Sequence, residues 1–157
     1  MVCYYSSVNA LTATGYVLSP DRTQILLIFH NKLGRWLPPG GHVDDDELPH
    51  LAVVREVFEE TGLQARIIDF SPDLLCTDLH TKQIPAPYCM HRDEIPPYGQ
   101  DSPEYYVDMV YIMQALTSEV ELQLDEIGKA QWFNRDQLEQ CDTWEIVKKI
   151  AYNVLEK

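Results

Sequence analysis

The sequence has few basic residues: 12 Lys and Arg stand against 25 Asp and Glu, which gives a formal net charge of −13. Surfaces that bind nucleic acid or anionic membrane need clustered Lys and Arg. The shortage therefore predicts no nucleic acid polymer and no membrane as partner. Runs of 18 consecutive apolar residues are absent as well, and the N-terminal residues lack the basic start and apolar run of a signal peptide.

Cysteine is also scarce and widely spaced. The four cysteines include no Cys-x-x-Cys pair, so their spacing indicates neither a zinc knuckle nor a disulfide framework. Reduced cysteines are typical of the cytosol, and we expect a cytoplasmic protein. What the chain does have is the content of one ordinary domain, with 157 residues of which 45% are hydrophobic. We predict a single domain over residues 1–157, as a monomer or homodimer.

The pattern of apolar residues predicts a mixed α and β fold. Two runs rich in β-branched and aliphatic residues, 7–18 and 23–30, flank a proline-containing turn and are typical of a hairpin. Further strands are predicted over 64–75, 105–115 and 131–133. Helices are predicted over 48–61, capped by Gly62, and over 143–155. The residues of the second helix expected to face inward are Trp144, Val147, Ile150, Ala151 and Leu155.

Prolines concentrate between Phe70 and Tyr105. Six of the ten prolines lie in this segment, together with His80 and His91. Because proline interrupts strands and helices, residues 71–104 are predicted to form a long loop. Long loops inside compact domains are usually functional, so we expect this one to lie over a site.

The helix predicted over residues 48–61 separates acidic from apolar side chains. At about 100° per residue, Glu56, Glu59 and Glu60 share one arc. The opposite side is predicted to face the core, and it carries Leu51, Val54, Val57 and Phe58. Like charges three and four residues apart repel, so such a cluster is stabilised chiefly when a divalent cation binds it. A solvated acidic helix face is the alternative.

Carboxylate ligands favour a hard cation, and we predict Mg²⁺ or Mn²⁺. The segment Pro38-Pro39-Gly40-Gly41, just before the helix, is predicted to form a sharp loop. This loop offers the Gly40 carbonyl as a further ligand. Magnesium often retains water and completes its shell with substrate phosphate.

Residues 41–63 match a longer pattern. They read Gly41, five residues, Glu47, seven residues, and then Arg55-Glu56-Val57-Phe58-Glu59-Glu60-Thr61-Gly62-Leu63. This resembles the signature of the Nudix hydrolases, G-x5-E-x7-R-E-U-x-E-E-x-G-U with U aliphatic, at every specified position. At average residue frequencies such a match arises by chance on the order of 10⁻⁹ times per starting position. The chain is therefore identified as MutT-like, a member of the Nudix family.

The resemblance implies a fold and an activity. The fold is a Nudix-like α/β/α sandwich with a mixed β-sheet. The activity is metal-dependent hydrolysis of the diphosphate linkage in a nucleoside diphosphate joined to another moiety. Such a compound is a small molecule, and it is the partner that we expect.

The resemblance also implies roles for motif residues. The metal ligands that it gives are Gly40, Glu56, Glu59 and Glu60, with Glu47 in support. Arg55 is expected to orient these glutamates. Glu56 is the general base in some members, whereas in others the base comes from outside the motif. We expect catalysis to involve Glu56, Arg55 and Glu59.

Residues outside the motif are candidates for binding the substrate. Arg35 and Trp36 precede the glycine pair and His42 follows it, where these side chains could meet phosphate, sugar or base. For Trp36 a packed core aromatic is the alternative. The resemblance further implies a carboxylate from outside the motif, and the candidates are Asp101, Glu104 and Asp108. Only Asp108 falls inside a predicted strand.

The sequence leaves the substrate open among nucleoside and deoxynucleoside triphosphates, sugars of the ADP-ribose type and CDP-alcohols. A non-catalytic sensor of the same fold, which binds a nucleotide or nucleotide sugar, is the alternative function. The complete set of motif carboxylates argues against it. An interaction protein with an acidic helix is a third hypothesis, and the match in spacing disfavours it.

Overall fold

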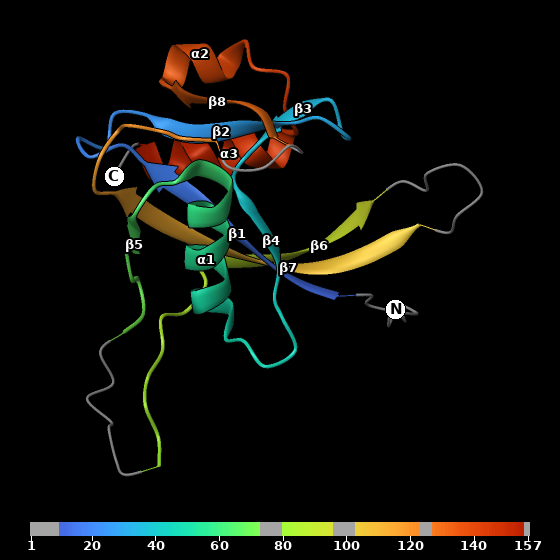
Figure 1. The fold of residues 1–157 in the computed structure, drawn as a ribbon, viewed down its shortest axis with the longest axis vertical. Coiled ribbons are helices and arrows are strands. Elements are labelled where there is room, and N and C mark those ends of the chain that lie inside the picture. The colour runs from blue at the N-terminus through green and yellow to red at the C-terminus, as the bar shows by residue number, and fades with distance from the viewer. Residues whose placement is uncertain (1–9, 73–79, 96–102, 123–126, 156–157) are drawn as a thin grey trace.

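The fold contains both helices and strands (Figure 1). The computed structural model describes residues 10–72, 80–95, 103–122 and 127–155. Within these residues the strands are β1 (Ala10–Leu18), β2 (Ile25–His30), β3 (Arg35–Leu37), β4 (Gly40–His42), β5 (Ala65–Ile67), β6 (Cys89–Ile95), β7 (Glu104–Ala115) and β8 (Ile127–Phe133). The helices are α1 (Pro49–Thr61), α2 (Arg135–Glu139) and α3 (Glu145–Leu155). None of these helices combines the length and apolar character that a membrane crossing requires.

The described strands form one mixed sheet. Its central path runs β3-β2-β1-β7-β5, while β8 pairs with β2, β4 with β1 and β6 with β7. β1 and β7 are parallel, with Thr12 opposite Asp108, and the remaining pairs are antiparallel. The predicted hairpin is confirmed at Leu18, which lies opposite Ile25. The parallel pair brings the first described strand next to Asp108.

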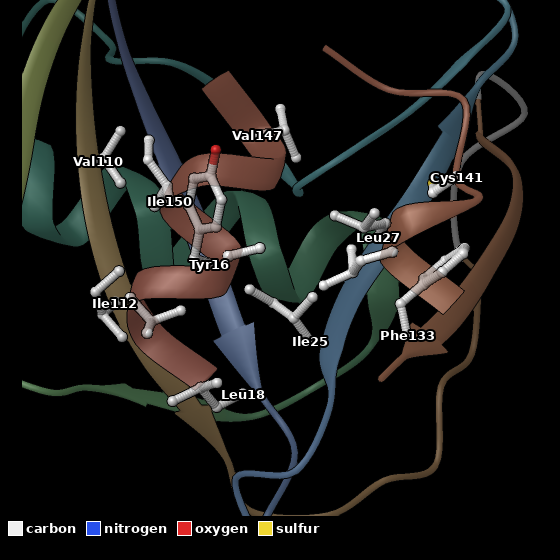
Figure 2. Close-up of a cluster of buried hydrophobic side chains, with 13 residues drawn as sticks. Tyr16, Leu18, Ile25, Leu27, Val110, Ile112, Phe133, Cys141, Val147 and Ile150 are labelled. Atoms are coloured by element: carbon white, nitrogen blue, oxygen red, sulfur yellow. The ribbon is translucent and has the colours of Figure 1, made fainter. Parts of the chain in front are cut away.

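The sheet has a hydrophobic core on each face. Because side chains alternate along a strand, β1 contributes Ala13 and Val17 to the core with α1, and Tyr16 and Leu18 to the core with α3. Figure 2 shows the latter core, where Val147 of α3 lies near Tyr16. Figure 1 shows α1 and α3 on opposite sides of the sheet. The predicted α/β/α sandwich with a mixed β-sheet is confirmed.

Helix α1 begins and ends close to the predicted positions. Leu48 precedes it in an extended conformation, and Pro49 occupies the first turn, where its missing N–H is no loss. Gly62 follows the helix in the left-handed region with φ 68°, which glycine adopts without strain. Its N–H donates to the carbonyl oxygen of Phe58 at 2.8 Å.

The buried face of α1 differs from the predicted one. Three residues predicted to face the core are instead 38–51% exposed: Leu51, Val54 and Phe58. Val57 is buried as predicted, together with Ala52 and Val53. The helix approaches β1 closely at Gly15, where a Cβ atom would lie only 2.8 Å from Val57. Because the helix and the strand lie so close together, only short side chains fit between them. The size of the apolar side chains therefore did not identify the buried face of α1.

Residues 71–104 do not form one long loop. β6 lies within them and pairs with β7, with His91 opposite Asp108. His91, expected in a loop, is therefore a strand residue. Pro87 and Pro96 flank β6, but no proline falls inside it, so the strand keeps its backbone donors. The loop prediction was wrong because the prolines lie on either side of β6, and their effect on the backbone was extended to residues between them.

Other element boundaries also differ from the prediction. β5 ends at residue 67 rather than 75, although 73–75 lie outside the described residues, and β8 begins at residue 127 rather than 131. The short helix α2 was not predicted. It is held by a reciprocal cap in which Asn134 Oδ1 accepts from the Gln137 N–H and Gln137 Oε1 accepts from the Asn134 N–H, each at 2.9 Å. α3 is confirmed, although it begins at residue 145 rather than 143. Val147, Ile150 and Ala151 are buried as predicted, whereas Trp144 and Leu155 are only partly buried against the same core.

Candidate metal centre and adjoining pocket

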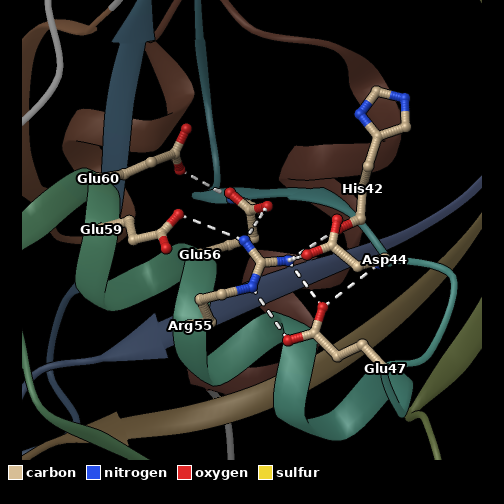
Figure 3. A network of polar contacts seen from close by, with 8 residues as sticks. His42, Asp44, Glu47, Arg55, Glu56, Glu59 and Glu60 are labelled. Carbon is tan, nitrogen blue, oxygen red and sulfur yellow. Dashed lines mark hydrogen bonds and ion pairs between the residues drawn. The ribbon is translucent and has the colours of Figure 1, made fainter.

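Arg55 lies among the carboxylates of the 41–63 motif (Figure 3). Its Nε and Nη2 donate to the two carboxylate oxygens of Glu47 at 3.0 and 2.8 Å. Its Nη1 donates to Glu56 at 2.7 Å and to Glu59 at 3.3 Å. Nη2 also donates to the backbone carbonyl of His42 at 3.0 Å. One guanidinium thus fixes three carboxylates and the backbone of β4 in a single arrangement.

The same contacts set the charge balance of the cluster. The hydrogen bond from Arg55 lowers the pKa of Glu47 below its ordinary value, and that bond raises the pKa of Arg55. Both side chains are therefore charged at neutral pH. A single guanidinium faces four carboxylates, those of Asp44, Glu47, Glu56 and Glu59, so acidic groups outnumber basic ones in the cluster, which favours a cation.

The glycines of β4 allow the backbone to approach the glutamates of α1. A Cβ atom on Gly41 would lie 2.6 Å from the carboxyl carbon of Glu56, so a larger residue would displace that side chain. The Gly40 N–H donates to Glu60 Oε2 at 2.9 Å, and Glu60 is only 7% exposed. The glycine pair was predicted as a loop. It forms a strand because Gly40 and Gly41 pair with β1.

The donor set of the motif fits a hard divalent cation. Glu56, Glu59 and Glu60 belong to the last two turns of α1 and offer only oxygen atoms, which suits Mg²⁺ or Mn²⁺. Arg55 supplies hydrogen bonds of the kind that hold metal-binding carboxylates in position. The residues present are therefore suited to the predicted ion.

Asp108 is a buried carboxylate on β7, only 4% exposed. Its Oδ1 accepts hydrogen bonds from Thr12 Oγ1 at 2.9 Å and Thr14 Oγ1 at 2.8 Å. Its Oδ2 lies 3.5 Å from His91 Nε2. Burial raises the pKa of Asp108, against the lowering effect of the threonine hydrogen bonds. Burying a carboxylate costs free energy, and such groups concentrate at functional sites.

Asp108 and the motif line one cavity of about 220 Å³. Gly40, Gly41 and Glu60 contribute the side nearest the motif. Further polar side chains lining it are Thr12, Thr14, Tyr16, His30, His91, Asp93 and Tyr106. The apolar lining consists of Ile28, Leu33, Leu37, Pro38, Trp144, Ile146 and Val147. An apolar wall with a few convergent polar groups is typical of a small-molecule site.

The chain is similar to known proteins in sequence and in fold. A model of the NUDIX domain family matches residues 9–154. The chain belongs to the NUDIX family. A crystal structure described as a hydrolase of the NUDIX family from Clostridium perfringens superposes on this NUDIX domain with a TM-score of 0.81 at 24% identity. The superposition covers 96% of this chain and 98% of that one, so the two share a fold.

Curated relatives match this NUDIX domain over shorter stretches. The m7GpppN-mRNA hydrolase NUDT17 of Danio rerio is 50% identical over 44 residues, which cover 28% of this chain and 13% of NUDT17. A MutT-like protein of Streptomyces ambofaciens is 36% identical over 59 residues, 38% of each chain. The matched stretches thus span well under half of either relative.

Two residues predicted to bind substrate lie apart from the cavity of this NUDIX domain. Arg35 donates to Asp142 at 3.2 Å on the surface. Trp36 packs edge-on against Phe29 and Phe133, with ring centroids 5.5 and 5.0 Å away. Neither Arg35 nor Trp36 lines the cavity. Trp36 is therefore packed among aromatic side chains, which was the alternative to a role in substrate binding.

The remaining candidates outside the motif differ in position. The His42 ring lies edge-on to Tyr106, and Figure 3 shows it turned away from the glutamates. Glu104 accepts a hydrogen bond from the Tyr106 hydroxyl and does not line the cavity. Asp101 lies outside the described residues. Asp108 is therefore the described candidate carboxylate that shares the cavity with Glu60.

Sequence reasoning expected His91 in a loop over the site and missed other polar residues of the NUDIX cavity. His91 and Asp93 are two positions apart on β6, and Thr12 and Thr14 have the same spacing on β1. Residues two apart on a strand face the same side of a sheet. This spacing was a usable signal on β6, but the assignment of residues 71–104 to a loop concealed it.

Proposed function

We propose that this NUDIX domain hydrolyses the diphosphate linkage of a nucleoside diphosphate joined to another moiety, using Mg²⁺ or Mn²⁺. One observation carries the proposal: Arg55 gathers motif carboxylates next to a cavity that Glu60 lines. Family membership supports it, as do relatives described as hydrolases. Nucleoside triphosphates and nucleotide sugars are the substrate classes to which the proposal applies first.

The motif residues have distinct roles in this proposal. Glu56, Glu59 and Glu60 would hold the ion, with the Gly40 carbonyl as a further ligand. When bound, the ion neutralises phosphate oxygens and lowers the pKa of its water. Glu47 acts through Arg55, to which it is joined by two hydrogen bonds.

Glu56 is the side chain that we assign to accept the proton of the attacking water. Its Oε1 accepts a hydrogen bond from Arg55 Nη1 at 2.7 Å, and its carboxyl group lies against Gly41. The side chain is 15% exposed, which leaves access for water. A carboxylate fixed beside a polarised water is suited to general-base catalysis.

The cavity would receive the part of the substrate that is not diphosphate. Trp144 and Ile146 give it an apolar wall suited to a base or sugar. Because Glu60 lines the same cavity, we expect the diphosphate of a ligand bound there to lie beside the motif. Contacts from Arg35, Trp36 and His42 to the substrate stay predictions.

A substrate panel tests the proposal. Nucleoside and deoxynucleoside triphosphates, nucleotide sugars and CDP-alcohols are incubated with the protein in Mg²⁺, in Mn²⁺ and in EDTA, and phosphate-bearing products are measured. We expect turnover of at least one compound with either ion, loss of turnover in EDTA, and recovery when Mg²⁺ alone is added back. Folded protein that binds one compound tightly but hydrolyses none would be a sensor, which contradicts the proposal.

A further inference from the structure

We propose that His91, Asp93 and Asp108 form a second metal site, for Zn²⁺ or a similar transition-metal ion, in the cavity beside the motif. These three side chains form a group whose potential ligand atoms all lie within 4.8 Å of one another. None of them belongs to the 41–63 motif. The inference goes beyond the proposed hydrolase and does not depend on it.

Strand register brings the three residues together. His91 and Asp93 are two apart on β6, so both face the same side of the sheet. β6 and β7 are antiparallel, and Asp108 lies directly opposite His91. All three side chains line the cavity. The site thus lies on two paired strands of the sheet, which gives it a rigid support.

The distances match those between ligands of one ion. His91 Nε2 lies 3.4 Å from Asp93 Oδ1 and 3.5 Å from Asp108 Oδ2. Hydrogen bonds between charged nitrogen and carboxylate oxygen are shorter, about 2.7–2.9 Å. Two ligands of a tetrahedral zinc ion, with bonds of about 2.0–2.1 Å, are separated by about 3.4 Å. The two distances from His91 are therefore those of two edges of a tetrahedral site, and all three ligand atoms lie within 4.8 Å of one another.

Asp108 is already held in the orientation that a ligand needs. Its Oδ1 accepts hydrogen bonds from Thr12 and Thr14, while Oδ2 faces His91. The side chain is 6% exposed, so these bonds form in a largely dry environment. Hydrogen bonds from neighbouring residues commonly orient metal ligands in this way.

The ligand set also distinguishes this site from the motif. Glu56, Glu59 and Glu60 offer only oxygen and suit Mg²⁺, whereas an imidazole with two carboxylates suits Zn²⁺. Three protein ligands leave a fourth position on a zinc ion. Since His91 and Glu60 line the same cavity, that position would be open to water or to an oxygen atom of a bound ligand. Asp108 would then contact the ligand through the ion.

Competition with a chromophoric zinc chelator, in excess Mg²⁺, tests the site. We expect wild-type protein to bind Zn²⁺, and His91→Gln and Asp93→Asn each to bind it at least about tenfold more weakly. Thr14→Val should weaken binding in the same direction. Bound Co²⁺ should show the intense visible absorption of tetrahedral coordination in the wild type and lose it in His91→Gln.

Two control variants separate this site from its surroundings. His30→Gln alters another histidine of the cavity, and Glu59→Gln alters the motif; both should keep wild-type affinity for Zn²⁺. If His91→Gln binds Zn²⁺ as tightly as the wild type, the group is an ion pair without a metal and the proposal is wrong. Loss of Zn²⁺ binding in Glu59→Gln alone would place the ion at the motif, which also overturns it.

Discussion

At the scale of single residues, the geometry of Arg55 matters more than its charge. The guanidinium donates through all three of its nitrogens: Nε and Nη2 donate to Glu47, and Nη1 donates to Glu56 and Glu59. Lysine has the same charge but only one nitrogen. We expect Arg55→Lys to lower the affinity for Mg²⁺ by about 10–100-fold, measured by calorimetric titration, and to reduce kcat/KM with it.

Arg35→Lys is the matched control for this substitution. Arg35 also pairs with a carboxylate, Asp142, but their side chains are 41% and 73% exposed and Arg35 lies outside the cavity. Exposed ion pairs contribute little, so we expect this variant to bind Mg²⁺ like the wild type. Equal Mg²⁺ affinity in Arg55→Lys would show that Arg55 does not position the glutamates.

At the scale of elements, the contact between β1 and α1 determines where the motif lies. A Cβ atom on Gly15 would lie 2.8 Å from Val57 Cγ2 and 3.1 Å from Val53 Cγ2. Gly15→Ala must therefore displace the side chains that it meets, or the helix α1 that carries Val53 and Val57. Overpacking of this kind costs about 1–3 kcal/mol, and we expect denaturant unfolding to show that loss of stability.

A double-mutant cycle with Val57→Ala checks the cause. Shortening Val57 removes the atom closest to the new methyl group, so the double variant should be more stable than the sum of the single effects predicts. We expect a coupling free energy of at least about 0.5 kcal/mol. Strict additivity would mean that the cost of Gly15→Ala does not come from this contact.

The same contact shows what the sequence could predict at this scale. Pro49 and Gly62 give the limits of α1 because their effects are local. The buried face of α1 depends on Gly15, which is distant in sequence. Phe58 is large and apolar, so it was predicted to face the core, but it lies on the exposed face. The motif carboxylates were predictable from their spacing. Asp93 was missed because its segment was assigned to a loop, and its place near Asp108 depends on the pairing of β6 with β7.

At the scale of the whole molecule, negative charge is concentrated in two segments. Residues 41–63 carry a net −6 and residues 93–128 a net −9, while the rest of the chain carries +2. Each segment contributes to the cavity: the first provides Glu60 and the second provides Asp93 and Asp108. The acidity that argues against polyanionic partners is thus concentrated in segments that line the cavity, as the two proposed cation sites require.

Divalent metal should therefore stabilise the folded protein. At one hundred times its Kd, a ligand that binds only the folded state adds about 2.7 kcal/mol. For a chain of this size each kcal/mol raises Tm by about 2–4 °C, so Mg²⁺ should raise Tm by roughly 5–11 °C in scanning calorimetry. NaCl at equal ionic strength serves as the control. A similar rise with NaCl would indicate screening rather than a metal site.

The central claim is that carboxylates of α1 hold the ion that makes hydrolysis possible. It is tested most directly by kcat/KM for the best panel substrate in Glu59→Gln and Glu60→Gln, with Glu139→Gln on α2 as a matched control outside the cavity. We predict that both motif variants lose at least about a hundredfold while folding normally, and that the control keeps wild-type activity. Wild-type kcat/KM in either motif variant would contradict the assignment.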